Sequence, residues 1–320
     1  MKLMLGADIS EYQQMMTESL FKQMVDAGLS FVIFKVQSVN RYNKIFEDPQ
    51  AQKYKSWCVK YGVPHGIYVY VYPGVSLTAQ VNFTNAMTKK YNPAITYMDI
   101  EEHKNYYTNL SYPGDWLSRY YKEYYDRMEG EKSIYTGKWF IDRYTPQSMS
   151  WIKDVEHTWW AEYLKYDWRW TYFLYTIRPM TLAKLPLIIE YLQGKAPTVP
   201  NGIWSIWQFI TNMGVKEMTD VNSWLLHFDW NIMPEYEYIE IFKGATPPPP
   251  PPVPTTEKYK VLQTLVLRTG AGYFYPRANI AFPYLLTGDI IEVDVIVNGY
   301  AHLVGGNYCA AGERYIRKIA

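Results

Sequence analysis

The sequence lacks an excess of charge of either sign. Its 320 residues contain 32 Lys and Arg against 31 Asp and Glu, which gives a net charge of +1. Nucleic acids and anionic membranes are bound by surfaces with a clear excess of positive charge. We therefore expect neither a nucleic acid nor a membrane as partner.

Cysteine and histidine are also scarce. Cys58 and Cys309 are the only cysteines, so neither a disulfide framework nor a CxxC metal site is indicated. The five histidines show no HxxxH or HxH spacing, and only His103 lies beside several acids. We expect no metal and no cofactor. A serine or cysteine nucleophile is not indicated, because GxSxG is missing and Cys58 falls within a predicted helix.

Long apolar runs are missing as well. No run of 18 apolar residues occurs, and the start, MKLMLGADIS, has too short an apolar run for a secretory signal. We expect a chain that is made in the cytoplasm without a signal peptide.

Aromatic residues, by contrast, are abundant. The 32 Tyr and 12 Trp are more than a core requires, and exposed rings stack on sugars, bases or apolar surfaces. Because the basic surface that would accompany nucleic acid is missing, sugars are the favoured ligand.

A proline run, GATPPPPPPVPTTEK (244–258), divides the chain. Consecutive prolines form a stiff polyproline II spacer that rises about 3.1 Å per residue. The predicted organisation is a domain at 1–243, a linker at 244–257 and a domain at 258–320. In the last part, short β-type runs alternate with Gly-rich turns, which predicts a small all-β barrel.

Apolar strand-like runs alternate with amphipathic helical stretches in the first part, and one of these helices is expected to begin at a Thr17 cap. The runs are 3–10, 31–37, 66–72, 94–100, 132–137, 158–163, 203–209 and 225–231. This alternation is typical of a parallel sheet and predicts an α/β fold with a (β/α)8-type barrel. An open doubly wound sheet is the alternative, although the first strand is not followed by GxGxxG.

Acids follow three of these runs. Asp8 ends the first, Asp99 and Glu101 end the fourth, and Asp229 ends the eighth. Barrels of this class place reacting groups at the carboxyl ends of their strands, so these acids are predicted to face one cleft, with Glu102 pointing away. Carboxylates in one cleft push their pKa values apart, so one can keep its proton while another stays ionised. Glycoside hydrolysis requires such a set.

The motifs in this order resemble the glycoside hydrolase family 25 lysozymes, the Chalaropsis-type muramidases common among phage endolysins. GADISEYQ (6–13) resembles the opening strand of the family and MDIE (98–101) its D-x-E, and the similarity spans nearly all of residues 1 to 235. Later strands of the family are similar to IYTG (134–137), WWAEY (159–163), IWQF (206–209) and DWN (229–231). The tail is similar to bacterial SH3-type cell-wall-binding domains through LVLRTGAG (265–272).

The resemblance implies a peptidoglycan hydrolase that cleaves the β-1,4 bond between N-acetylmuramic acid and N-acetylglucosamine. It implies that Glu101 is the general acid, that Asp99 stabilises an oxazolinium or oxocarbenium species, and that Asp8 and Asp229 orient and polarise the site. The residues implied to line the glycan groove are Tyr68, Tyr135, Trp159, Tyr163 and Gln208. The partner would be bacterial peptidoglycan, reached from the cytoplasm after holin-type release or from a virion.

Three alternatives stay open. A non-catalytic wall-binding or virion structural protein could keep the barrel as a lectin. A chitinase-type barrel would carry D-x-D-x-E, but the residue two before Asp99 is Tyr97. Asp220 also begins a D-x-N, although Asp229 is favoured because an apolar run precedes it.

The sequence also departs from the family pattern. QSVN (37–40) replaces the usual T-E-G after the second strand, and Val69-Tyr70 replaces an aromatic pair. Residues 164–203 form a longer segment than usual, either an aromatic flap or a packed excursion. The target species, the ligand of the tail and the oligomeric state are not predicted.

Overall fold

The computed structural model describes residues 2–105, 108–145, 148–164, 182–197, 204–213, 228–242, 257–267, 284–297, 300–303 and 308–319. Contacts divide the chain into two compact units. The described residues up to 242 belong to the first unit, and those from 257 onward belong to the second.

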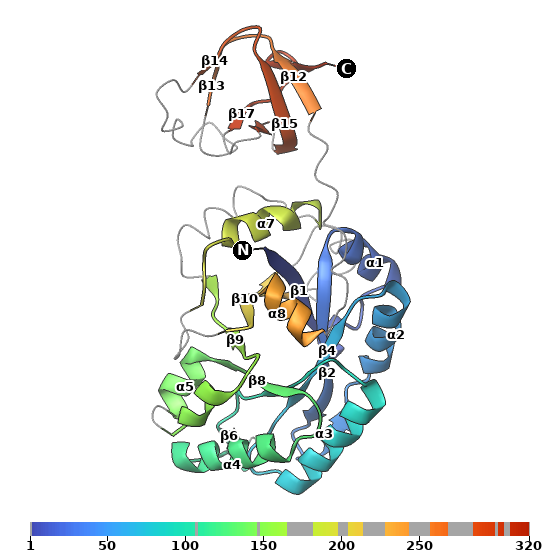
Figure 1. Cartoon of the computed structure of the whole chain (residues 1–320), viewed down its shortest axis with the longest axis vertical. Coiled ribbons are helices and arrows are strands. Elements are labelled where there is room, and N and C mark those ends of the chain that lie inside the picture. Colours follow the sequence, from blue (N-terminus) through green and yellow to red (C-terminus); the bar gives the residue numbers. More distant parts are fainter. Residues whose placement is uncertain are drawn as a thin grey trace. The chain divides into compact units, whose positions relative to one another are not determined.

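A closed eight-stranded barrel forms the first unit, and the predicted (β/α)8-type fold is confirmed (Figure 1). Around the barrel the strands follow the order β1, β11, β10, β9, β8, β5, β4, β2, and pairing of β1 with β2 closes it. Their bounds are β1 (Leu3–Ile9), β2 (Leu29–Val39), β4 (His65–Tyr70), β5 (Thr96–Asp99), β8 (Lys132–Gly137), β9 (Trp159–Ala161), β10 (Ile206–Met213) and β11 (Phe228–Pro234).

One strand departs from the predicted parallel sheet. β11 runs antiparallel to both of its neighbours, β1 and β10, whereas the other barrel pairs are parallel. The prediction was wrong here because the apolar pattern of a strand is the same in either direction. The reversal matters for the site, since it brings the first residues of β11 to the rim where the parallel strands end.

Helices surround the strands and begin and end at the expected signals. The longer ones are α1 (Glu18–Asp26), α2 (Ala51–Tyr61), α3 (Leu77–Tyr91) and α4 (Gly114–Arg127), which line the outside of the barrel in Figure 1. Thr17 caps α1 by accepting a hydrogen bond from the Leu20 amide at 3.2 Å, as predicted. Gly62 ends α2 with φ of +65°, a conformation that glycine adopts without steric cost.

Shorter elements complete this unit. They are the 3-10 helices η1 (Glu11–Gln13), η2 (Ser150–Asp154) and η4 (Leu182–Lys184), the helices α5 (Lys138–Tyr144), α7 (Leu185–Leu192) and α8 (Glu235–Ile241), and the strands β3 (Ile45–Glu47), β6 (Lys104–Asn105) and β7 (Leu110–Ser111). Within the long segment 164–203, Leu185, Ile188 and Leu192 of α7 are buried, so this part is a packed helix. The aromatic stretch 165–173 lies outside the described residues.

The barrel interior is apolar and tightly filled below the rim. Phe31, Tyr97 and Trp159 are buried inside it, together with Tyr238 and Phe242 from the end of the unit that α8 occupies. α8 follows the last residue of the antiparallel β11, so it lies at the opposite end of the barrel from the carboxyl ends of the parallel strands. The rim with the acids is therefore the end that stays open to a ligand.

The second unit is built from antiparallel strands. One sheet has the order β17 (Tyr308–Ala310), β16 (Tyr300–Leu303), β15 (Ile290–Val297), β12 (Glu257–Val261) and β18 (Ile316–Lys318), and β13 (Leu265–Val266) pairs with β14 (Tyr284–Leu285). Its core includes Val261, Leu265, Ile291 and Ile316. Among its described residues there is no helix, in agreement with the predicted all-β character.

Across the described ranges of the chain, no helix is both long and apolar enough to cross a membrane. Cys58 and Cys309 are buried free thiols in the two different units.

Candidate active site

A cavity of about 570 Å³ opens at the rim of the barrel, and the four predicted acids line it together. They come from the ends of β1 and β11 and from the end of β5 and the loop after it. Of the residues expected to line a groove, the cavity wall includes Tyr68, Tyr135, Trp159 and Gln208. Tyr163 lies behind this wall, where its hydroxyl donates to Gln208 Oε1 at 2.9 Å. Asp220, the alternative to Asp229, lies outside the described residues.

Asp8 and Asp229 meet because of the antiparallel pairing. The register of β1 and β11 places them directly opposite each other. Asp8 is the sixth residue of the seven-residue β1, whereas Asp229 is the second of β11, so the reversal of β11 is what unites them. The prediction that both acids share one rim holds, although Asp229 starts its strand instead of ending it.

Asp8 is held by two side-chain amides. Its Oδ2 accepts a hydrogen bond from Gln208 Nε2 at 2.9 Å and one from Asn231 Nδ2 at 2.8 Å. Burial, followed by the nearby charge of Asp229, raises the pKa of Asp8 well above its usual value, and the two amides act in the opposite direction. Because Oδ2 is occupied by two donors, a proton on Asp8 would be carried by Oδ1.

The two amides are themselves fixed in orientation. Gln208 Oε1 accepts hydrogen bonds from the hydroxyls of Tyr135 (2.8 Å) and Tyr163 (2.9 Å), so its nitrogen is the atom that faces Asp8. Asn231 Oδ1 accepts a hydrogen bond from Trp159 Nε1 at 2.8 Å, so the nitrogen of Asn231 also faces Asp8. Three predicted groove residues therefore also support the position of an acid.

Asp99 and Glu101 lie close enough for each to shift the pKa of the other. Burial is the largest cause that raises both pKa values, to about 7 for Glu101 and well above the usual range for Asp99. The charge of Asp229 also raises the pKa of Glu101, whereas Lys35 lowers that of Asp99. The expected division, in which Asp99 is ionised and Glu101 keeps the proton, stays a prediction, because burial raises the pKa of both groups.

Asp99 also offers an oxygen to a ligand. It is only 4 % exposed, and its Oδ1 has no hydrogen-bond partner among the described residues. A buried carboxylate oxygen without a partner is costly, and a substrate donor can satisfy it.

Glu102 points away from the cavity, as predicted. Its buried carboxylate accepts hydrogen bonds from the backbone amides of His103 and Lys104 at 3.0 and 3.1 Å, and from the hydroxyl of Tyr70 at 3.2 Å. It fixes the loop that follows β5, and it does not line the cavity.

Lys35 lines the cavity but was not recognised from the sequence. Its ammonium group lies 3.0 Å from Glu11 Oε1 and 3.8 Å from Asp48 Oδ2. The signal was present, since a lysine inside the apolar run FVIFKVQ has to find a counter-charge. Asn231, which donates to Asp8, was recognised in the sequence only as part of the DWN motif. Arg41, which lines the cavity, was not recognised at all.

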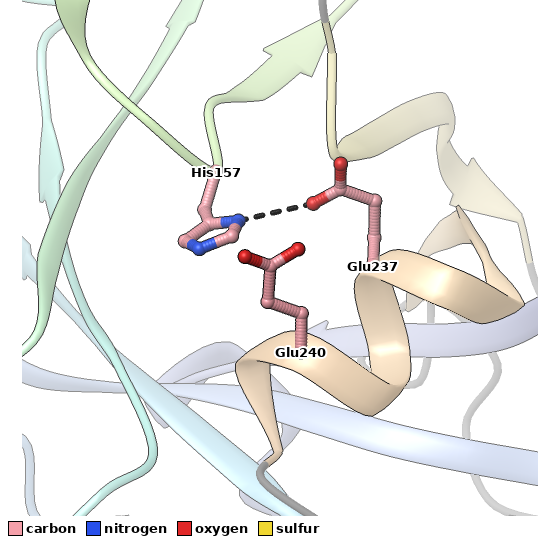
Figure 2. A group of neighbouring side chains, drawn as sticks. All are labelled: His157, Glu237 and Glu240. Atoms are coloured by element: carbon pink, nitrogen blue, oxygen red, sulfur yellow. Dashed lines mark hydrogen bonds and ion pairs between the residues drawn. The ribbon is translucent and has the colours of Figure 1, made fainter.

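A possible metal-binding group lies at the other end of the barrel. His157, two residues before β9, and Glu237 and Glu240 of α8 have ligand atoms within 4.8 Å of one another. Figure 2 shows both carboxylates turned toward the imidazole, and His157 Nδ1 is 3.0 Å from Glu237 Oε2. This ion pair joins α8 to the segment before β9. It lies at the end of the barrel opposite the four acids, so it is not part of the cavity.

No family model matches the sequence, and no curated protein matches it. Solved structures with a similar fold include a muramidase from Acremonium alcalophilum, which is 16% identical in sequence with a TM-score of 0.51. The alignment covers 75% of this chain and 99% of the muramidase. The bacterial lysozyme from Streptomyces coelicolor is 18% identical with a TM-score of 0.50, and the alignment covers 76% of this chain and 98% of the lysozyme. The spore cortex lytic enzyme SleM from Clostridium perfringens is 14% identical with a TM-score of 0.51, and the alignment covers 99% of this chain and 97% of SleM. At these identities the likeness establishes the fold, and the chemistry is argued from the site.

Proposed function

We propose that this protein is a peptidoglycan hydrolase of the family 25 lysozyme type. It would cleave the β-1,4 bond between N-acetylmuramic acid and N-acetylglucosamine. The observation that carries the proposal is the convergence of Asp8, Asp99, Glu101 and Asp229 in one aromatic-walled cavity. The names of the structures with the same fold, a muramidase, a lysozyme and a spore cortex lytic enzyme, support the choice of substrate.

Glu101 is proposed as the general acid. A general acid works best when its pKa lies near the working pH, and burial together with Asp229 raises the pKa of Glu101 to about 7. Glu101 would protonate the glycosidic oxygen.

Asp99 is proposed to stabilise the positive charge on the sugar. When the proton resides on Glu101, Asp99 is ionised and its Oδ1, which has no hydrogen-bond partner among the described residues, can accept a hydrogen bond from the substrate. That donor would be the N–H of the acetamide group, which Asp99 would orient as nucleophile while balancing the charge of the oxazolinium species.

Asp8 and Asp229 are proposed to orient the substrate and to set the electrostatics of the site. Asp229 raises the pKa of both Glu101 and Asp8. Asp8 is held rigidly by Gln208 and Asn231, as expected for a group that positions a ligand.

The second unit is proposed to be an SH3-like wall-binding domain that recognises wall peptide or glycan. Tethering it to the barrel through a stiff linker would raise the local concentration of enzyme at the wall. We propose that the chain reaches this wall by holin-type release or as a virion component, as in an endolysin.

The test is release of reducing ends from purified cell walls by the wild type and by Glu101→Gln. We expect release by the wild type and a loss of at least about 100-fold in the variant, the magnitude typical of general acid catalysis. Walls that are bound but never cut would instead support the lectin alternative. Equal activity of both proteins would remove Glu101 from the mechanism.

A further inference from the structure

Part of the cavity wall is formed by a β-hairpin that starts at the carboxyl end of β2, and its turn carries Arg41, a cation without an ion-pair partner among the described residues. β2 and β3 pair antiparallel from Gln37–Glu47 to Val39–Ile45, and residues 40–44 form the turn. Four consecutive residues of this hairpin, Ser38, Val39, Asn40 and Arg41, line the same cavity as the acids. The hairpin occupies the place where the sequence departs from the family pattern.

The turn is rigid and anchored. Asn40 Oδ1 accepts hydrogen bonds from the amides of Tyr42 (2.9 Å) and Lys44 (3.1 Å), and Asn43 adopts φ of +60°. The side chain of Asn43 accepts a hydrogen bond from Asn105 Nδ2 at 3.4 Å, which ties the turn to β6. The backbone at Arg41 is therefore held in place, while its side chain is exposed.

Two cations line the cavity, and only one of them is neutralised. Lys35 forms ion pairs with Glu11 and Asp48. Within the described part of the chain, Arg41 has no ion-pair partner, and its guanidinium lies 4.9 Å from the centre of the Tyr42 ring. Tyr42 itself is 63 % exposed and does not line the cavity, whereas Arg41 does.

Arg41 therefore lines the cavity without an ion-pair partner among the described residues. A guanidinium placed in this way is suited to bind a carboxylate of a ligand in a bidentate manner.

We propose that Arg41 and Tyr42 form a subsite for a carboxylate of the stem peptide, which is attached to the lactyl group of N-acetylmuramic acid. This inference rests on the proposed function. The glycan backbone of that substrate is otherwise uncharged, so the stem peptide is the part that supplies a carboxylate beside the cleavage site. The subsite makes the protein prefer glycan whose stem peptides carry free carboxylates.

The experiment compares soluble glycan strands with unmodified stem peptides (stem-bearing strands) with the same strands after carbodiimide coupling to ammonia has converted the stem carboxylates to amides (amidated strands). Both are freed of phosphate-containing polymers. Removal of the stems by an amidase is not a suitable control, because it frees the lactyl carboxylate of N-acetylmuramic acid. The full chain is assayed as wild type, Arg41→Gln, Arg41→Lys and Lys44→Gln. Lys44 is the matched control, because it is an exposed cation of the same turn that does not line the cavity.

On stem-bearing strands, we expect Arg41→Gln to raise KM about tenfold with kcat unchanged, the range for one exposed charge-assisted contact. Arg41→Lys should recover part of the loss, and Lys44→Gln should behave as wild type. On amidated strands, all four proteins should have the same KM. An equal rise on both substrates, or an equal rise for Lys44→Gln, would overturn the subsite. A rise that appears only on walls that retain phosphate polymers would assign the cation to phosphate and overturn it as well.

Binding separates this inference from the proposed function. The dissociation constants of Glu101→Gln and of Glu101→Gln/Arg41→Gln for both kinds of strand do not depend on cleavage. A tenfold weaker affinity of the double variant for stem-bearing strands alone would support the subsite even if the wild type cut nothing. Equal affinities would reject it even if the wild type were an active muramidase.

Discussion

Asp8 of β1 lies directly opposite Asp229 of β11, in an antiparallel pair at the rim of an otherwise parallel barrel. The pairing brings two carboxyl groups together in a cavity that already contains Asp99 and Glu101. The charge of Asp229 raises the pKa of Glu101, so the reversed strand also shifts the acid proposed as proton donor.

Replacement of Asp229 is expected to move the pH profile of the reaction. Glu101, with a pKa of about 7, must be protonated to act, so kcat/KM should fall as the pH rises through that value. Asp229→Asn removes a charge that raises this pKa, so the alkaline limb should shift to lower pH. Residual reducing-end release between pH 4 and 9 measures the shift. Asp142→Asn, which removes an exposed acid paired with Lys138 outside the cavity, should leave the limb in place. An unmoved limb in Asp229→Asn would mean that another group titrates there.

Gln208 is expected to act through Asp8. Gln208→Met keeps the length of the side chain and removes the donor to Asp8 as well as the acceptor for the hydroxyls of Tyr135 and Tyr163. Losing one hydrogen bond to a charged group costs about 1.5 to 3 kcal/mol, so kcat/KM should drop by about 10- to 100-fold. The pH optimum of the reaction should also move, because the hydrogen bond from Gln208, which lowers the pKa of Asp8, is lost. Full activity with an unchanged pH profile would show that the amide does not position Asp8. Thermal unfolding checks that the variant is folded.

The strand ends were predictable, but their partners were not. Asp8, Asp99 and Glu101 were placed correctly because apolar strands are recognisable in the sequence and their carboxyl ends share one rim. The reversal of β11 left no trace in the apolar pattern. Similarly, the spacing that selects Gln208 as a cavity residue gives no indication that its amide binds Asp8, since that contact joins residues 200 positions apart.

Charge compensation was the other limit of prediction. The sequence shows that Lys35 interrupts an apolar strand, but Glu11 and Asp48 reach it from outside that strand. Likewise, the expected charge on Asp99 followed from its being one of two neighbouring acids, whereas its pKa in the structure is governed first by burial. Burial of a particular carboxyl group depends on the whole tertiary structure.

Lys35 is expected to be important for stability as well as for the site. Lys35→Met leaves the buried carboxylate of Asp48 without its cation, although the amides of Glu11 and Gln50 still donate to it. Removing one partner of a buried ion pair costs about 3 to 5 kcal/mol. Lys122→Met breaks an exposed pair with Asp126 and should cost less than about 1 kcal/mol. Urea unfolding of the two variants measures the contrast, and equal losses would show that Lys35 is not required to balance buried charge.

The ion pair between His157 and Glu237 is expected to make stability depend on pH. Its hydrogen bond to Glu237 raises the pKa of His157, so the stabilisation is complete below the pKa of an unfolded histidine, about 6.5, and is lost as the pH rises through the folded value. His157 also lowers the pKa of Glu237, despite opposing burial, so the contribution of Glu237 is present above its unfolded pKa and lost as the pH falls through the folded value. The pair should therefore stabilise the protein most between these two limits.

The measurement is the difference in unfolding free energy between the wild type and His157→Gln as a function of pH. The difference should be largest near pH 6 and should shrink as the pH approaches 9, because the wild-type histidine loses its charge. His65→Gln is the matched comparison, since burial lowers the pKa of His65 to about 4 and it is neutral throughout this range. A constant difference for His157→Gln would mean that the imidazole holds α8 by packing and not by its charge.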